Sequence, residues 1–168
     1  MKNNVAFIIK EISDITGNLP VKKALQKTVF LIEKKGVQLG FDYVLHFYGP
    51  YCADLDHETS RLSADGIVNF NYSQFGHKMS ISEGCEEISS EDLTCDQIHI
   101  IEDVITRYKE KTASDLELLT TAIYAFDFAG ATTRSGVIDN VKRIKGNKYN
   151  DQEIEWALNE FSYFGVSL

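Results

Sequence analysis

Cys52, Asp56 and His57 are the residue types of a thiol nucleophile, an orienting carboxylate and a general base, and they lie within six positions of the sequence. Such a thiol attacks an acyl carbon only when the imidazole lies within hydrogen-bond reach of it. The surrounding residues predict a helix from about Ala53 to Ala64, and residues five apart on one helix do not share a face. The trio is therefore a poor catalytic arrangement, and we expect no enzyme activity from it.

The cysteines and histidines also lack the spacing of a metal site. Cys52 with His57, or His77 with Cys85, supplies one pair of ligands, whereas a tetrahedral zinc site needs a second pair. The segment 130–136, GATTRSG, is faintly similar to a phosphate-binding loop, but it lacks the lysine after the second glycine and lies between two predicted helices. We expect no metal and no cofactor, and a tight connection between helices at 130–136.

The overall charge argues against nucleic acid as a default partner. The chain has 168 residues and a formal net charge of -8, so it repels the phosphate backbone unless a local basic patch offsets the repulsion. Its three cysteines have no close pairing and predict reduced thiols. The N-terminal MKNNVAFIIKEI has short apolar runs broken by Lys10 and Glu11, which predicts neither a signal peptide nor a membrane span. We expect a cytoplasmic protein.

Two amphipathic helices open the chain. Apolar residues recur at helical spacing before Gly17, a residue suited to ending a helix in the left-handed conformation. A second helix is predicted between Pro20 and Gly36, because proline fits the first turn and glycine fits the end.

A strand, a helix and a hairpin follow. Apolar and polar residues nearly alternate over 41–47, which predicts a half-buried strand, and Gly49-Pro50 is expected to end it before the helix at 53–64. Short β-prone runs at 67–72 and 78–82 predict a hairpin, with Gly76 available for a positive φ.

An acidic segment, EGCEEISSEDLT, occupies residues 83–94, and the rest of the chain after it is predicted to be helical. Four helices are predicted, and Ser114 with Glu117 is expected to form the capping box of the second. The expected fold is α+β and mainly helical: a winged-helix-like block at 1–82 with a small sheet, an acidic linker at 83–94, and a helical block at 95–168 packed on the first as one compact unit.

Two stretches carry a resemblance to known families. KALQKTVFLIEKKG at 23–36 and LHFYGPYCADLDHETSRLSADGIV at 45–68 resemble the bacterial YwgA family and, more distantly, the SocA-like or Panacea antitoxin domains. Leu25-Gln26-Lys27 and Phe47-Tyr48-Gly49-Pro50-Tyr51 match the pattern of these families, and the likeness extends loosely to TASDLELLTTAIYAF and IKGNKYNDQEIEWAL. The resemblance implies an antitoxin or adaptor that holds a partner protein, with DNA binding as an inherited alternative and no catalytic residues.

Two groups of residues are candidates for binding that partner. The second predicted helix carries five lysines against Glu33, and Lys23, Lys27 and Lys34 can share a face. Such a face either docks an acidic partner or simply solvates the helix. The other group is the corner Tyr48, Gly49, Pro50 and Tyr51, whose aromatic rings serve either as partner anchors or as packing residues.

DNA binding through the helix before the hairpin is opposed by local charge. That helix carries four carboxylates, at residues 54, 56, 58 and 65, against Arg61, and the hairpin supplies only Lys78. We therefore expect a non-catalytic antitoxin or adaptor that binds a partner protein, such as a toxin or the client of a protease adaptor, and no membrane. The alternative is a winged-helix transcriptional regulator that binds DNA as a homodimer.

Overall fold

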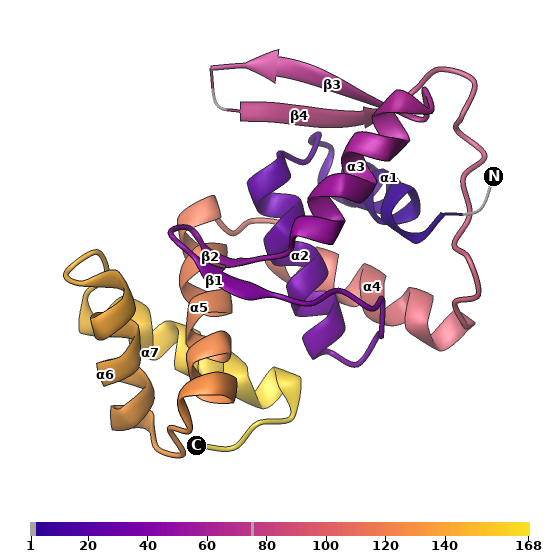
Figure 1. Cartoon of the computed structure of the whole chain (residues 1–168). Coiled ribbons are helices and arrows are strands. Elements are labelled where there is room, and N and C mark those ends of the chain that lie inside the picture. Colours follow the sequence, from indigo (N-terminus) through magenta and orange to yellow (C-terminus); the bar gives the residue numbers. More distant parts are fainter. Residues whose placement is uncertain (1–2, 75) are drawn as a thin grey trace. The chain divides into compact units, whose positions relative to one another are not determined.

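Helices dominate the structure, and the predicted α+β, mainly helical class is confirmed. The computed structural model describes residues 3–74 and 76–168, which form two compact units (Figure 1). The described part of the first unit comprises residues 3–43, 52–74 and 76–110, and the second unit comprises 44–51 and 111–168.

Each unit contains helices and one two-stranded antiparallel hairpin. The elements of the first unit are α1 (Asn4–Thr16), α2 (Lys22–Lys34), α3 (Ala53–Ala64), β3 (Val68–Ser73), β4 (Gly76–Ile81) and α4 (Cys95–Tyr108). Those of the second unit are β1 (Val44–His46), β2 (Gly49–Tyr51), α5 (Ala113–Ala129), α6 (Arg134–Lys145), α7 (Asp151–Asn159) and the 3₁₀ helix η1 (Glu160–Phe164). Within the described residues, no helix is both long and apolar enough to cross a bilayer.

The first helix begins and ends at residues that suit its two ends. The Asn3 side chain accepts a hydrogen bond from the Ala6 N–H at 2.9 Å. Gly17 closes the helix with φ of 69°, a conformation that costs glycine least, and the predicted cap is confirmed. The buried face of α1 includes Val5, Ile8, Ile9 and Ile12.

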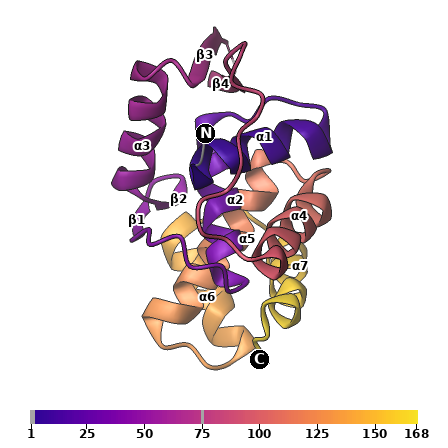
Figure 2. The same cartoon turned by 90° about the vertical axis from the view of Figure 1, so that its right-hand side faces the viewer.

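α2 is the central helix of the first unit, with α3 on one side and α4 on the other (Figure 2). Gln26, which is buried in α2, pairs with the backbone of Cys52 at the start of α3. The Gln26 Nε2 donates to the Cys52 carbonyl at 2.8 Å, and the Cys52 N–H donates to Gln26 Oε1 at 2.9 Å. A carboxamide offers both a donor and an acceptor, so one side chain satisfies both buried backbone groups.

Glu33 holds the loop that follows α2. Its Oε1 accepts hydrogen bonds from the N–H groups of Leu39 at 3.0 Å and Phe41 at 3.1 Å. Burial raises the pKa of Glu33, and these donors offset the effect only in part. Tyr43 packs edge to face on Phe30 with ring centroids 5.0 Å apart. These contacts fix residues 39–43 in the first unit, directly before hairpin β1–β2.

The helix and hairpin expected of a winged-helix-like block follow one another as predicted. α3 occupies the predicted residues 53–64, and β3 pairs with β4 beyond it, with Gly76 at φ of 118°. Phe75, in the predicted loop, lies outside the described residues. The Met79 N–H donates to the Pro20 carbonyl at 2.8 Å, and the Met79 side chain is fully buried, so the hairpin is attached to the start of α2.

The acidic segment 83–94 belongs to the first unit. The Asn3 N–H donates to the Ser89 carbonyl at 3.1 Å, and the Glu91 N–H donates to the Asn4 side chain at 2.7 Å. α4 follows this segment and packs on α1 and α2. After its excursion at residues 44–51, the chain therefore passes to the second unit for the last time after residue 110, and not at the predicted linker.

The second unit is built around α5, which packs against α6, α7 and β2 (Figure 1). The predicted capping box of α5 is wrong: Thr112 and Asp115 form it, two residues earlier than Ser114 and Glu117. The connection from α5 to α6 is tight, as predicted, with Gly130 at φ of 64° and Thr133 capping α6. Gly146 follows the end of α6, and the Asn150 side chain caps the start of α7 by accepting a hydrogen bond from the Glu153 N–H.

The Gln26 pair yields a testable prediction. Gln26→Ala should destabilise the first unit by about 3 kcal/mol, because it leaves a buried donor and a buried acceptor of Cys52 without partners. Amide hydrogen exchange at Cys52, followed by NMR, should accelerate in the variant. Gln38→Ala, at an exposed glutamine of the following loop, is the matched control and should change neither quantity. Unchanged Cys52 exchange in Gln26→Ala would show that the pair does not protect this strand-to-helix junction.

Candidate functional site

Hairpin β1–β2 presents two adjacent aromatic residues at its tip. His46 lies opposite Gly49, so Phe47 and Tyr48 form a two-residue loop. Gly49 has φ of 87°, which residues with a side chain rarely adopt. The Phe47 and Tyr48 rings meet edge to face with centroids 5.0 Å apart, and the two residues are 79% and 42% exposed.

The strand prediction for this region needs correction. The strand was expected over 41–47 but begins only at Val44, because the backbone before it is bonded to Glu33. Gly49-Pro50 does not end the sheet segment: Pro50 lies within β2, opposite Leu45. A proline is tolerated there because each strand of a two-stranded ribbon has one side without a partner strand.

The C-terminal end of α6 lies beside this hairpin and is basic. Lys142, Arg143 and Lys145 lie in its last turn, and Lys148 follows shortly after. Cations at this end of a helix are stabilised by the partial negative charge of the unpaired carbonyls. Lys142 pairs with Asp151 at 2.5 Å, whereas Lys145 and Lys148 have other partners.

Lys145 connects α6 to both the hairpin and α5. Its Nζ donates to the Phe47 carbonyl and to Glu117 Oε1, each at 2.8 Å, and the Lys148 Nζ donates to the same Glu117 oxygen at 2.7 Å. The Lys145 side chain is only 4% exposed, and Glu117 is buried. A buried ion pair is tolerated when further hydrogen bonds satisfy its members, and the Phe47 carbonyl does so for Lys145. We call Glu117, Lys145 and Lys148 the Glu117 cluster.

The charges of the Glu117 cluster shift the pKa of its carboxyl. Burial alone would raise the pKa of Glu117, but the hydrogen bonds and charges of Lys145 and Lys148 outweigh burial and lower it. The pKa of Lys148 is raised by the same carboxylate, although burial acts in the other direction. At neutral pH Glu117 is therefore ionised and Lys148 is protonated.

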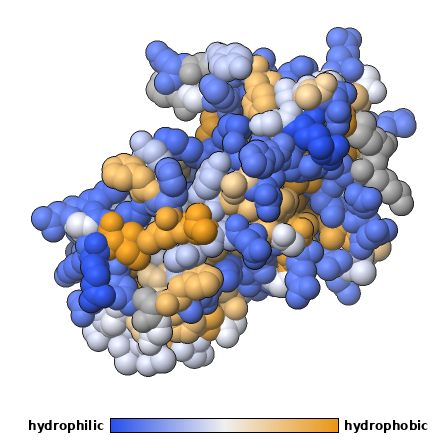
Figure 3. Space-filling model, in the orientation of Figure 1, coloured by the Kyte–Doolittle hydropathy of each residue, from blue (hydrophilic) through white to orange (hydrophobic). Residues whose placement is uncertain are grey.

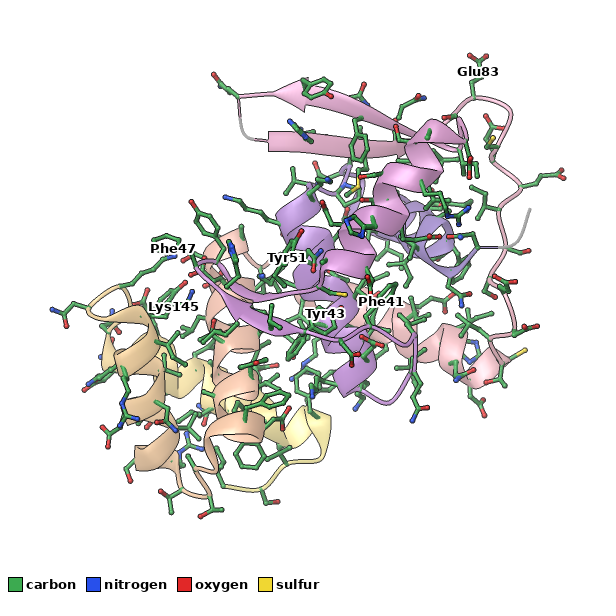
Figure 4. All side chains as sticks on the ribbon, viewed as in Figure 1. Phe41, Tyr43, Phe47, Tyr51, Glu83 and Lys145 are labelled. Carbon is green, nitrogen blue, oxygen red and sulfur yellow. The ribbon has the colours of Figure 1, made fainter. Side chains whose placement is uncertain are left out.

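An open pocket of about 340 Å³ lies between the hairpin and the end of α6, entirely within the second unit. It is lined by Leu45, His46, Phe47, Ile144, Lys145 and Lys148. Figure 3 shows hydrophobic residues gathered over the hairpin on this face, and Figure 4 shows Phe47 at the hairpin tip next to Lys145. The lining of the pocket thus combines apolar side chains with two lysines.

The lysines predicted to share a binding face do not all face solvent. Lys23 is exposed, Lys34 is half-buried, and Lys27 is only 5% exposed. The expectation of one solvated lysine face is therefore corrected at Lys27, because α2 is central in its unit and is covered on several sides. All three lysines belong to the first unit, whereas the predicted corner at 48–51 belongs to the second.

The predicted corner is only partly accessible. Gly49 and Pro50 are buried and Tyr51 is half-buried, so Tyr48 is the exposed member. The sequence predicted no site at Phe47, Leu45, Ile144 or the Glu117 cluster. The available signal was the run of cations at 142–148, which sequence alone could not connect to a hairpin about a hundred residues earlier.

The residue types of nucleophilic and metal chemistry are not brought together. Cys52 is buried and caps α3, with its Sγ accepting from the Leu55 N–H at 3.4 Å, while His57 is exposed. All three cysteines are free thiols. Among residues 3–74 and 76–168, no three histidine, cysteine, aspartate or glutamate side chains form a group that could hold a metal ion.

The charges on α3 do not favour a phosphate backbone. Arg61, the only lysine or arginine of this helix, pairs with Glu58 at 2.6 Å and with Asp65 at 3.0 Å. Lys22, at the start of α2, pairs with Asp56 at 2.7 Å. A helix that enters the major groove needs cations directed at phosphates, whereas Arg61 and Lys22 are paired with carboxylates.

No family model matches the chain, and no curated protein matches it closely enough to count as a relative. The likeness to the YwgA and SocA-like families therefore stays a prediction.

The Glu117 cluster predicts a pH-dependent stability. Because the pKa of Glu117 is lower in the folded protein than its ordinary value of 4.5, ionised Glu117 stabilises the fold above that pH, and the contribution is lost as the pH falls through the folded-state pKa. Glu117→Gln should lower the free energy of unfolding by about 3 kcal/mol at pH 7 and less at pH 3. Urea denaturation followed by fluorescence of Trp156, the single tryptophan and a residue of the second unit, measures both. An equal loss at both pH values would rule out an ionised Glu117.

Proposed function

We propose that this protein is a non-catalytic binding module whose partner protein docks on the tip of hairpin β1–β2. The observation that carries the proposal is the continuous exposure of Val44, Leu45, Phe47 and Tyr48 on a hairpin whose tip is held by a buried lysine. Single exposed apolar residues are ordinary, but a contiguous apolar patch beside a pocket is typical of an interaction site.

The chemistry of the tip supports a protein as the partner. Phenylalanine and tyrosine bury large areas at low conformational cost, and such aromatic anchors contribute much of the affinity of protein interfaces. Because the Phe47 carbonyl is already bonded to Lys145, the loop is ordered before binding, which lowers the entropic cost of docking. The resemblance to SocA-like domains adds the proposal that the partner is a toxin or the client of a protease adaptor.

We place this binding in the cytoplasm and propose that it involves no catalytic step. Free cysteines suit a reducing compartment, and the one candidate nucleophile, Cys52, is buried as a helix cap. Binding of DNA as a homodimer is the competing hypothesis, and the carboxylates around Arg61 argue against it. Retardation of a duplex oligonucleotide near physiological salt, with an affinity that falls steeply as salt is added, would favour DNA binding instead.

Site-specific photo-crosslinking tests the docking site. Benzoylphenylalanine introduced at Phe47 in cells that naturally carry the protein should give one dominant crosslinked product under ultraviolet light. The same residue introduced at Tyr72 is the matched control, because Tyr72 is equally exposed, at 79%, on the other hairpin. The product should be absent from the Tyr72 variant. No product at position 47, or the same product at both positions, would count against the hairpin tip as the docking site.

A further inference from the structure

The pocket beside the hairpin carries excess positive charge in a protein that is otherwise acidic. Lys145 and Lys148 both donate to a single oxygen of Glu117, so one carboxylate faces two ammonium groups. Arg143, in the last turn of α6, is exposed, while Lys142 is already paired with Asp151. With a net charge of -8 for the whole chain, this local excess of cations selects for an anionic group on the ligand.

The position of Lys148 makes it the residue best placed to receive that anion. Its side chain is 44% exposed and its Nζ lies 5.3 Å from the centroid of the Tyr149 ring, so the ammonium is held at the surface by Glu117 and Tyr149. An ammonium has three N–H donors, and a carboxylate accepts several hydrogen bonds. A carboxylate placed beside Lys148 would therefore complete the charge balance of the Glu117 cluster.

The pocket also has apolar side chains in its lining, and these call for an apolar group next to the anion. Leu45, Phe47 and Ile144 line it, and burying such side chains under a ligand is favourable by roughly 25 cal/mol for each Å² of apolar surface removed from water. A volume of about 340 Å³ holds a few side chains at most, which suits a short peptide segment.

We infer that the pocket binds an acidic peptide segment of the partner protein, with a Glu or Asp carboxylate on Lys148 and a neighbouring leucine-like side chain against Leu45, Phe47 and Ile144. This inference rests on the proposed function and adds the chemistry of the partner. The carboxylate comes from a side chain within the partner's chain, and the apolar residue supplies most of the buried area.

Matched peptides test the carboxylate. The acetylated, C-terminally amidated peptide Ala-Leu-Glu-Leu-Ala and its Gln-for-Glu analogue are titrated into the full-length ¹⁵N-labelled protein at low ionic strength. The chemical-shift changes caused by the peptides should be confined to the signals of residues 44–48 and 144–148. The Glu peptide should bind about threefold more tightly than the Gln peptide, the range expected for a partly exposed ion pair, and added salt should reduce the difference.

Three variants sharpen the test. Lys148→Ala should abolish the preference for the Glu peptide. Lys142→Ala, which removes a lysine from the same helix end that is paired with Asp151, should keep the preference. Glu117→Gln, provided that its spectrum is that of a folded protein, should increase the preference because it removes the competing carboxylate. If Lys148 had only a structural role, Lys148→Ala and Glu117→Gln would not change the preference for the Glu peptide in opposite directions.

Three outcomes would overturn the inference. Equal affinity for the two peptides would show that the pocket does not select a carboxylate, and shifts at α2 in place of the pocket would put the acidic segment on the other lysine group. Shifts of residues 44–48 that depend on protein concentration alone would identify a second copy of this chain as the occupant. The crosslinking experiment at Phe47 tests the proposed function separately. A crosslinked partner combined with equal affinity for the Glu and Gln peptides would reject only the acidic character of the partner's segment.

Discussion

The hydrogen bond between the Lys145 ammonium and the Phe47 carbonyl is the interaction on which the candidate site depends. Lys145 is almost completely buried, so its charge must be balanced, and Glu117 of α5 balances it. The same ammonium then fixes a carbonyl at the tip of a hairpin whose strands have only three residues each. A two-stranded ribbon this short is marginal by itself, so its order must come from contacts with α5 and α6.

The residues of the first unit that flank this hairpin in the sequence are held by equally specific polar contacts within that unit. Glu33 bonds the backbone at Leu39 and Phe41 before the hairpin, and Gln26 bonds both backbone groups of Cys52 after it. The chain thus leaves the first unit at a fixed position, contributes eight residues to the second, and returns to a fixed position. Between these two positions the side chains of Phe47 and Tyr48 are exposed at the tip of the hairpin.

Local signals in the sequence predicted most of the elements but little of the site. The end of the first helix at a glycine cap, Gly17, was placed correctly, because capping is decided within a few residues. Hairpin β1–β2 was missed, because a proline inside a strand is locally unfavourable and is tolerated here only because each strand of this two-stranded ribbon has one side without a partner strand. Lys27 was taken for a surface residue and Glu117 for a cap, since their burial and their partners depend on contacts that are distant in sequence. The lysine run at 142–148 was visible, but its position beside Phe47 was not.

Backbone dynamics of the hairpin in wild-type protein and in Lys145→Met test the central claim most directly, because methionine keeps most of the apolar stem of Lys145 and removes its ammonium. The ¹⁵N order parameters of residues 44–51 should be about 0.85 in the wild type, as for rigid backbone, and should fall below about 0.6 at Phe47 in the variant while α5 and α6 stay ordered. A hairpin that is equally rigid in both proteins, or already mobile in the wild type, would contradict the claim that Lys145 orders the binding tip.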